Sequence, residues 1–138
     1  EYAYAKQNNM AHTQLKNAAG NFVQPSAESF AAAGNADWKN TPGFNIVLTN
    51  QADANAWPIS AATFILVHKN PTNPENVKNT LKFFDWAYTG GDEAAKSLDF
   101  VPFSAESKAI FRASWNEVVG KDGKPLFEAT ATAASATK

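Results

Sequence analysis

The feature that most constrains this fold is a short apolar run followed closely by a capped amphipathic helix. Residues 63–68 read TFILVH, a pattern typical of a strand that is buried on both faces of a parallel sheet. Pro58 precedes the run and favours an extended entry into it. After the run, Asn73-Pro74-Glu75 supply a capping side chain, a proline at the first helical position and an acid that suits the helix dipole. A buried strand that leads into a capped helix predicts an α/β fold.

The helix that begins after Asn73 should have one apolar face. Four large apolar residues recur at helical spacing and form a single stripe: Val77, Leu81, Phe84 and Tyr88. We expect this stripe to be buried, Asn76 and Lys82 to be exposed, and Gly90-Gly91 to end the helix. A second amphipathic helix is predicted over residues 104–119, closed by Gly120, with these residues on its inner face: Ile110, Phe111, Trp115 and Val118.

Other segments carry weaker signals. Residues 2–10 suit a short helix that ends near Asn8 and Asn9, and residues 27–33 suit a helix capped by Ser26 and stopped by Gly34. A strand is predicted at 44–49 and a short helix near 92–98. The final residues, 128–138, have no periodic apolar pattern and are predicted to be a disordered tail or an addition made in cloning.

Composition excludes several classes of function. The 138 residues carry 12 Lys and Arg against 13 Asp and Glu, and this balance gives no pull toward nucleic acid. The absence of cysteine excludes disulfides, thiolate metal sites and cysteine nucleophiles. The longest apolar run, 61–67, is too short to span a bilayer. Because the chain opens on Glu1 without a methionine, we expect a processed end or a cut within a longer chain.

The titratable residues do not form a recognisable catalytic or metal motif. His12 and His68 lack metal-ligand spacing, and His68, at the end of the apolar run, is predicted to be a capping or surface residue. Asp85 could be a buried catalytic acid or a carboxylate bonded to a neighbouring element, and we favour the second because no other acid lies within helical reach. Arg112, the one arginine, is expected to be paired at the surface. We predict no catalytic residue and no metal-binding residue.

The four tryptophans allow two interpretations. They could form a platform on which a sugar stacks, or they could fill the core. Their wide separation in the sequence favours core packing: Trp38, Trp57, Trp86 and Trp115.

Several segments carry a family resemblance when they are taken in order. They are EYAYAKQNN at 1–9, AWPISAATFILVHK at 56–69, LKFFDWAY at 81–88, SLDFVPF at 97–103, and GKPLF at 123–127 after the Trp115 helix. In this order and spacing they resemble the periplasmic phosphate-binding proteins, the receptors of high-affinity phosphate ABC importers. The resemblance covers about residues 1–127 and points to the C-terminal portion of such a receptor, whose chain is more than twice as long.

The resemblance implies a two-lobed periplasmic binding protein fold of type II, with a mixed sheet flanked by helices. Residues 1–57 would belong to the second lobe, and 58–68 would form a crossing strand that returns through the hinge. Residues 69–127 would add C-terminal helices to the first lobe, followed by the tail at 128–138.

The implied function is binding of inorganic phosphate in the periplasm and its delivery to the membrane permease of an ABC importer. The resemblance implies no enzyme activity, no cofactor, no nucleic-acid partner, and a monomer when the protein is intact. In the family, the phosphate ligands come from the earlier part of the chain and include a Ser-Gly-Thr segment, an Arg and an Asp. None of those motifs occurs here. We therefore expect scaffold, with no phosphate-binding residue in this segment. The alternatives are a stand-alone structural or interaction module and, less favoured, a phosphatase-like hydrolase that uses Asp85 or His68.

Overall fold

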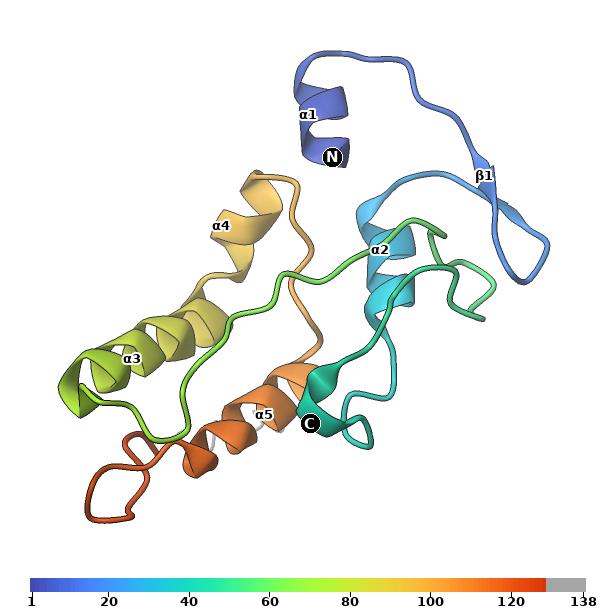
Figure 1. Cartoon of the computed structure of the whole chain (residues 1–138). Helices are drawn as coiled ribbons and strands as arrows, with labels where there is room; N and C mark the ends of the chain where they lie inside the picture. Colours follow the sequence, from blue (N-terminus) through green and yellow to red (C-terminus); the bar gives the residue numbers. More distant parts are fainter. Residues whose placement is uncertain (129–138) are drawn as a thin grey trace, which may run out of the picture.

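The structure is a computed structural model that describes residues 1–128. Its elements, in chain order, are α1 (Tyr2–Gln7), β1 (Leu15–Lys16), β2 (Phe22–Val23), α2 (Ala27–Gly34), the 3-10 helix η1 (Pro42–Phe44), α3 (Pro74–Gly90), α4 (Asp92–Ser97), α5 (Ala105–Ser114) and the 3-10 helix η2 (Trp115–Glu117). Helices are therefore the main regular structure, and the sheet is a small two-stranded one (Figure 1). The tail predicted at 128–138 lies outside the described residues, apart from Glu128.

Side-chain caps begin α2 and α3 where the sequence predicted them. At the start of α2, Ser26 Oγ accepts a hydrogen bond from the Ser29 amide at 3.2 Å, and Ser29 Oγ accepts one from the Ser26 amide at 3.0 Å. At the start of α3, Asn73 Oδ1 accepts from the Asn76 amide at 3.2 Å, and Pro74 occupies the first turn. Each cap satisfies an amide that the helix itself leaves without a partner, which fixes where the helix begins.

The apolar stripe of α3 is confirmed. Leu81 is fully buried and the other members are half-buried on the same face, whereas Asn76 and Lys82 are exposed. The helix ends at Gly90 as predicted, and Gly91 then also precedes the first residue of α4. A side chain at Gly91 would have its Cβ 2.6 Å from the Ala87 carbonyl oxygen, so the close succession of α3 and α4 requires glycine there.

The helix predicted over 104–119 is shorter than expected. Its α-helical part, α5, ends at Ser114, and η2 continues only to Glu117. Gly120 does not close the helix: its amide donates to the Lys124 carbonyl at 2.8 Å, beside a bridge between Val119 and Pro125. The backbone after η2 is therefore held by a turn. The helix ends before Val118, the last residue of the predicted apolar face.

The small sheet is an antiparallel hairpin that the sequence analysis did not predict. Leu15 pairs with Val23, and Lys16 pairs with Phe22. Between the strands Gly20 adopts a φ of 88°, a conformation that glycine tolerates and that closes the turn.

The two strands predicted at 44–49 and 63–68 do not form within the described part of the chain. Residues 45–48 are irregular after η1, and residues 63–68 run without a turn or a bend between α3 and α5 (Figure 1). A strand is defined by its hydrogen bonds to a neighbouring strand, and neither segment has such a neighbour among residues 1–128. The parallel sheet inferred from the apolar run is thus absent from this part of the chain.

The buried core lies between α5 and residues 38–48. Trp38, Leu48 and Phe111 form its centre. The Trp38 and Phe111 rings meet edge to face with centroids 5.2 Å apart, and Phe103 contacts both rings in the same way. Edge-to-face pairs of this kind add stability beyond their buried area. The core fixes the loop before η1 against α5.

Candidate functional site

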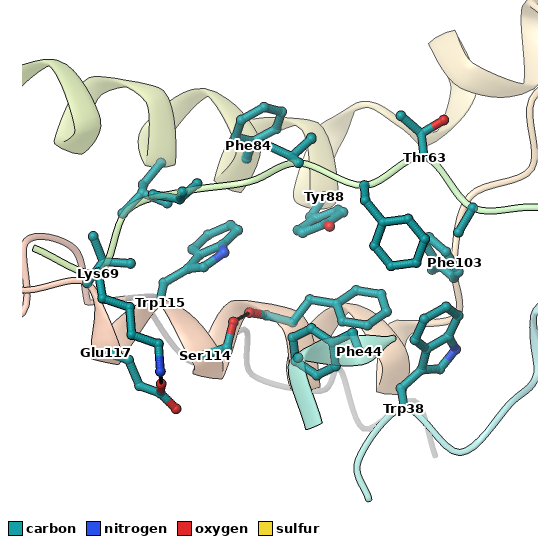
Figure 2. Close-up of a pocket in the computed structure, with 18 residues that line it drawn as sticks. Trp38, Phe44, Thr63, Lys69, Phe84, Tyr88, Phe103, Ser114, Trp115 and Glu117 are labelled. Carbon is teal, nitrogen blue, oxygen red and sulfur yellow. Dashed lines mark hydrogen bonds and ion pairs between the residues drawn. The ribbon is translucent and has the colours of Figure 1, made fainter. Parts of the chain in front are cut away.

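An aromatic cavity of about 320 Å³ lies between α3, α5, η2 and the open segment at 62–69. Figure 2 shows its ring side chains pointing toward a common space from separate elements: Trp38, Phe44, Phe84, Tyr88, Phe103 and Trp115. Of the tryptophans, Trp38 and Trp115 belong to this packed region, as the core interpretation predicted. Trp86 does not, because its side chain is 57% exposed. The cavity is one candidate for a binding site in the described part of the chain.

The helices position these rings through their apolar stripes. On α3, Phe84 and Tyr88 follow Leu81 at helical spacing and turn the same face toward α5. Tyr88 stacks on Trp115 with ring centroids 5.8 Å apart and an interplanar angle of 9°. Phe111 projects from α5 and meets Phe44 edge to face at 5.1 Å. The walls are therefore built from ring contacts that lock one another in place.

Three polar side chains at the cavity have partners within the chain: Ser114, Lys69 and Glu117. Ser114 Oγ donates to the Phe111 carbonyl of its own helix at 2.6 Å. Lys69 and Glu117 form an ion pair at the rim, where both side chains are largely exposed (Figure 2). Burial raises the pKa of the Tyr88 hydroxyl above its ordinary value, and the group is neutral at physiological pH in either case. A dry phosphate site needs several convergent donors, and this cavity offers apolar contact instead.

A wider hollow of about 1040 Å³ lies between α1, α2 and residues 59–63 and 99–104. The charged residues that line it are both acids, Glu1 and Asp99, and Asp99 is paired with Lys6. Acidic side chains repel an anion, so this hollow does not suit phosphate either.

Arg112 is buried, and this overturns the expectation that it would be paired at the surface. Its side chain on α5 is in contact with Asp85 on α3, with Nε donating to Asp85 Oδ1 at 2.8 Å and Nη2 to the same oxygen. The pairing itself was predicted, as was the interpretation of Asp85 as a carboxylate bonded to a neighbouring element. This pair joins α3 to α5, and the guanidinium charge of Arg112 faces the Asp85 carboxylate.

A second ion pair lies on the same side of α5. Lys108 is buried and contacts Asp92 in the first turn of α4. The sequence analysis missed this pair, because the partners are 16 residues apart and their spacing carries no local signal. Together the two pairs tie α5 to α3 and α4, which holds the cavity wall in position.

Asn17 is a further structural residue that the sequence analysis missed. It is buried, and its side-chain amide donates to the carbonyls of Ala54 and Ala56 at 2.9 and 3.2 Å. Its Oδ1 accepts from the Asn21 amide at 3.0 Å. The hairpin is thereby fixed to the loop at 53–56. The signal available in the sequence was an Asn followed three residues later by Gly20, a turn pattern.

Neither histidine lies in a metal or catalytic arrangement. His12 is exposed and contacts Tyr2 edge to face at 5.8 Å, and its Nδ1 lies 3.3 Å from the Met10 carbonyl oxygen. His68 is exposed, as predicted for a surface residue. Over residues 1–128, no three His, Asp or Glu side chains are grouped as metal ligands.

None of the helices between residues 1 and 128 combines the length and the apolar composition that crossing a bilayer requires. This matches the short apolar run noted in the sequence.

No family model matches the chain. Comparison with curated proteins shows extensive similarity to three phosphate-binding proteins named PstS. The chain is 50% identical to that of Pasteurella multocida over 130 residues, which cover 93% of the chain and 38% of the relative. It is 51% identical to that of Haemophilus influenzae over 116 residues, covering 83% of the chain and 35% of the relative. It is 48% identical to that of Xylella fastidiosa strain 9a5c over 116 residues, covering 83% of the chain and 32% of the relative.

These relatives are named as binding proteins, and this supports the prediction that the chain is not an enzyme. The chain is thus similar to a class of binding proteins. More particularly, it is related to the phosphate-binding protein PstS and corresponds in sequence to a portion of it, as its motifs predicted. It spans between 32% and 38% of the length of these relatives.

Proposed function

We propose that this chain is part of a periplasmic phosphate-binding protein that captures inorganic phosphate and passes it to the permease of an ABC importer. The observation that carries the proposal is the identity of about half of all residues to proteins named for phosphate binding, maintained over 93% of the chain. Similarity of this extent reflects shared packing along nearly the whole segment, and it does not favour a hydrolase or a stand-alone structural module.

Within that protein the chain supplies scaffold and not the phosphate ligands. Arg112, the one arginine, is buried in a pair with Asp85, and turning it toward an anion would leave that carboxylate without its partner. The aromatic cavity has apolar walls, and the two charged residues that line the wider hollow are acids, Glu1 and Asp99. Phosphate-binding residues would then belong to the rest of the protein.

The proposed arrangement is the C-terminal portion of a type II, two-lobed fold with a mixed sheet flanked by helices. Residues 1–57 contribute to the second lobe, residues 58–68 cross between the lobes, and residues 69–127 cover the first lobe with helices. What supports this division is the open path of 58–68 between a region that contains α1, α2 and the hairpin and a region that contains α3 to α5 (Figure 1). The intact protein acts as a monomer without nucleic acid or cofactor.

Calorimetry tests the assignment of scaffold and ligand. The isolated 138-residue chain should give no saturable heat when it is titrated with inorganic phosphate at micromolar concentration. In a chimera, this chain replaces the matching segment of the Pasteurella multocida relative. The chimera should bind phosphate saturably. Sulfate serves as the control anion for selectivity.

Tight phosphate binding by the chain alone would overturn the scaffold assignment. A folded chimera that binds no phosphate, although the intact relative does so under the same conditions, would overturn the proposed function.

A further inference from the structure

The helix α1 lies at the edge of the molecule, and none of its residues is buried (Figure 1). It is six residues long, and a helix of that length is unstable in water unless other elements hold it. At its first residue, the Tyr2 ring meets the Phe30 ring of α2 edge to face, with centroids 5.5 Å apart. In its last turn, Lys6 forms an ion pair with Asp99, which lies just after α4. The C-terminal end of α1 is therefore held by an ionic contact.

Asp99 has a backbone conformation that favours glycine. Its φ is 63°, in the left-handed region. The Asp99 amide donates to the Lys96 carbonyl at 3.0 Å, and the next amide, that of Phe100, donates to the Ala95 carbonyl at 3.0 Å. These two bonds form a Schellman motif at the end of α4, and glycine is the usual residue at the left-handed position of that motif. Aspartate at this position adds what glycine lacks, namely the carboxylate that contacts Lys6.

The pair joins distant parts of the chain and is open to solvent on one side. Lys6 and Asp99 are separated by 93 residues. The Asp99 side chain is 16% exposed, whereas the Lys6 side chain is 57% exposed. Salt screens an ion pair that water reaches. The contact that holds the end of α1 should therefore weaken as the ionic strength rises.

The same residues stand at the wide hollow of about 1040 Å³. Glu1, Tyr2 and Ala3, at the start of α1, line this hollow, and Asp99 and the residues that follow it, 100–104, line it as well. The hollow thus lies between α1 and the segment to which the pair fastens α1. Breaking the pair would free the C-terminal end of α1 and open this wall.

We propose that the Lys6–Asp99 pair is an ionic strap that keeps α1 closed along the wall of the wide hollow, and that ionic strength sets how often α1 opens. Asp99 occupies a glycine position at the end of α4 because its carboxylate closes the strap. The strap is a property of this chain by itself and is independent of phosphate binding, so its failure would leave the proposed function untouched.

Amide hydrogen exchange, measured by NMR on the full 138-residue chain, tests the strap. The amides of Ala5 and Asn8 report on α1, because they donate to carbonyls of its first turns at 3.2 and 3.1 Å. Asp99→Asn removes the charge and keeps a side chain that tolerates the left-handed conformation. Both amides should then exchange about fivefold faster, the upper end of the effect of a partly exposed ion pair. Lys6→Gln should have the same effect, and Lys6→Arg, which keeps the charge, should have little.

Two further variants separate the strap from local effects in α4. Glu93→Gln breaks the exposed pair with Lys96 inside α4, and it should leave exchange of the α1 amides unchanged. Asp99→Gly relieves the backbone at the end of α4 but removes the carboxylate, so it should still speed exchange in α1 by about fivefold. The amide spectrum of α5 should stay the same in each variant, which shows that the rest of the fold is intact.

Salt distinguishes an ionic strap from a packing contact. Between about 0.01 M and 1 M sodium chloride the screening length falls from about 30 Å to about 3 Å. In the unmodified chain, this increase should speed exchange of the Ala5 and Asn8 amides by about threefold. In the Asp99→Asn chain, the same increase should change their exchange little, because the pair is already broken.

Three outcomes would overturn the strap. The first is unchanged exchange of the α1 amides in both Asp99→Asn and Lys6→Gln. The second is an equal acceleration in Glu93→Gln, which would indicate a general effect of charge. The third is a salt response that persists in full in Asp99→Asn, which would assign it to other charges. Absent phosphate binding by the folded chimera, together with a normal strap, would overturn only the proposed function.

Discussion

The helical layer of α3 to α5 and the open segment at 61–68 lie against each other, yet they are stabilised in opposite ways. The helices carry their own backbone hydrogen bonds, are fixed by caps such as Asn73, and are joined by the Arg112–Asp85 pair. The segment has no hydrogen-bonded neighbour within residues 1–128 and leaves Leu66 in solvent. The helices are therefore satisfied by bonds within the described chain, whereas the backbone of the open segment is not.

This difference follows from the range of the interactions. A helix bonds each amide to a carbonyl four residues away, so a short chain contains everything it needs. A strand bonds to another strand that can lie anywhere in the sequence. When a chain spans a fraction of its relatives' length, its helices can therefore form while its strands lack partners. Two substitutions in the helices and one in the segment test this comparison.

The largest effect is expected from breaking the pair that joins α3 and α5. Arg112→Ala leaves the Asp85 carboxylate partly buried without its partner. It should lower the free energy of unfolding by about 3 kcal/mol, the lower end of the range for buried pairs. Urea denaturation followed by circular dichroism gives the value. The double variant Arg112→Met with Asp85→Leu should recover most of the loss, because two apolar side chains leave no uncompensated charge.

An exposed pair supplies the control for this experiment. Lys69 and Glu117 are both largely exposed at the cavity rim, and Lys69→Ala should leave the midpoint of denaturation unchanged within error. Equal losses in Arg112→Ala and Lys69→Ala would show that the buried pair has no special role in holding the helices.

A somewhat smaller effect is expected at the centre of the α3 stripe. Leu81 is fully buried, and Leu81→Ala removes its contacts and leaves a space next to the aromatic cavity. Because an existing cavity lets the site relax, the loss should lie near 2.5 kcal/mol, in the lower part of the usual range of about 2–5 kcal/mol. Urea denaturation again provides the measurement. A loss below about 1 kcal/mol, typical of surface positions, would contradict the burial of this helix face.

The sequence predicted the features that depend on neighbouring residues. The caps at Ser26 and Asn73, the stripe through Leu81 and the stop at Gly90 all follow from spacings of a few residues, and all are confirmed. The resemblance to phosphate-binding proteins was likewise carried by local segments, and the comparisons confirm it.

Features that depend on distant residues were missed or misplaced. Asp85 and Arg112 are 27 residues apart, so the sequence could indicate that Arg112 would be paired but not that the pair would be buried. The hairpin at 15–23 rests on Asn17, whose amide reaches carbonyls almost forty residues away. The strand at 63–68 was inferred from a pattern that describes burial in a sheet, and that sheet is absent from the described part of the chain.

The smallest effect should come from a leucine-to-alanine change in the open segment at residues 61–68. Leu66 is 95% exposed, so Leu66→Ala removes almost no buried area and should change the free energy of unfolding of the chain by less than about 0.5 kcal/mol. In the chimera that includes the rest of the Pasteurella multocida relative, the same change should cost about 2–5 kcal/mol, because Leu66 would then lie inside a sheet. Leu81→Ala should cost nearly the same in both contexts. If Leu66→Ala were equally mild in the folded chimera, residues 61–68 would be surface in the longer protein too, and the contrast between the helices and the open segment would fail.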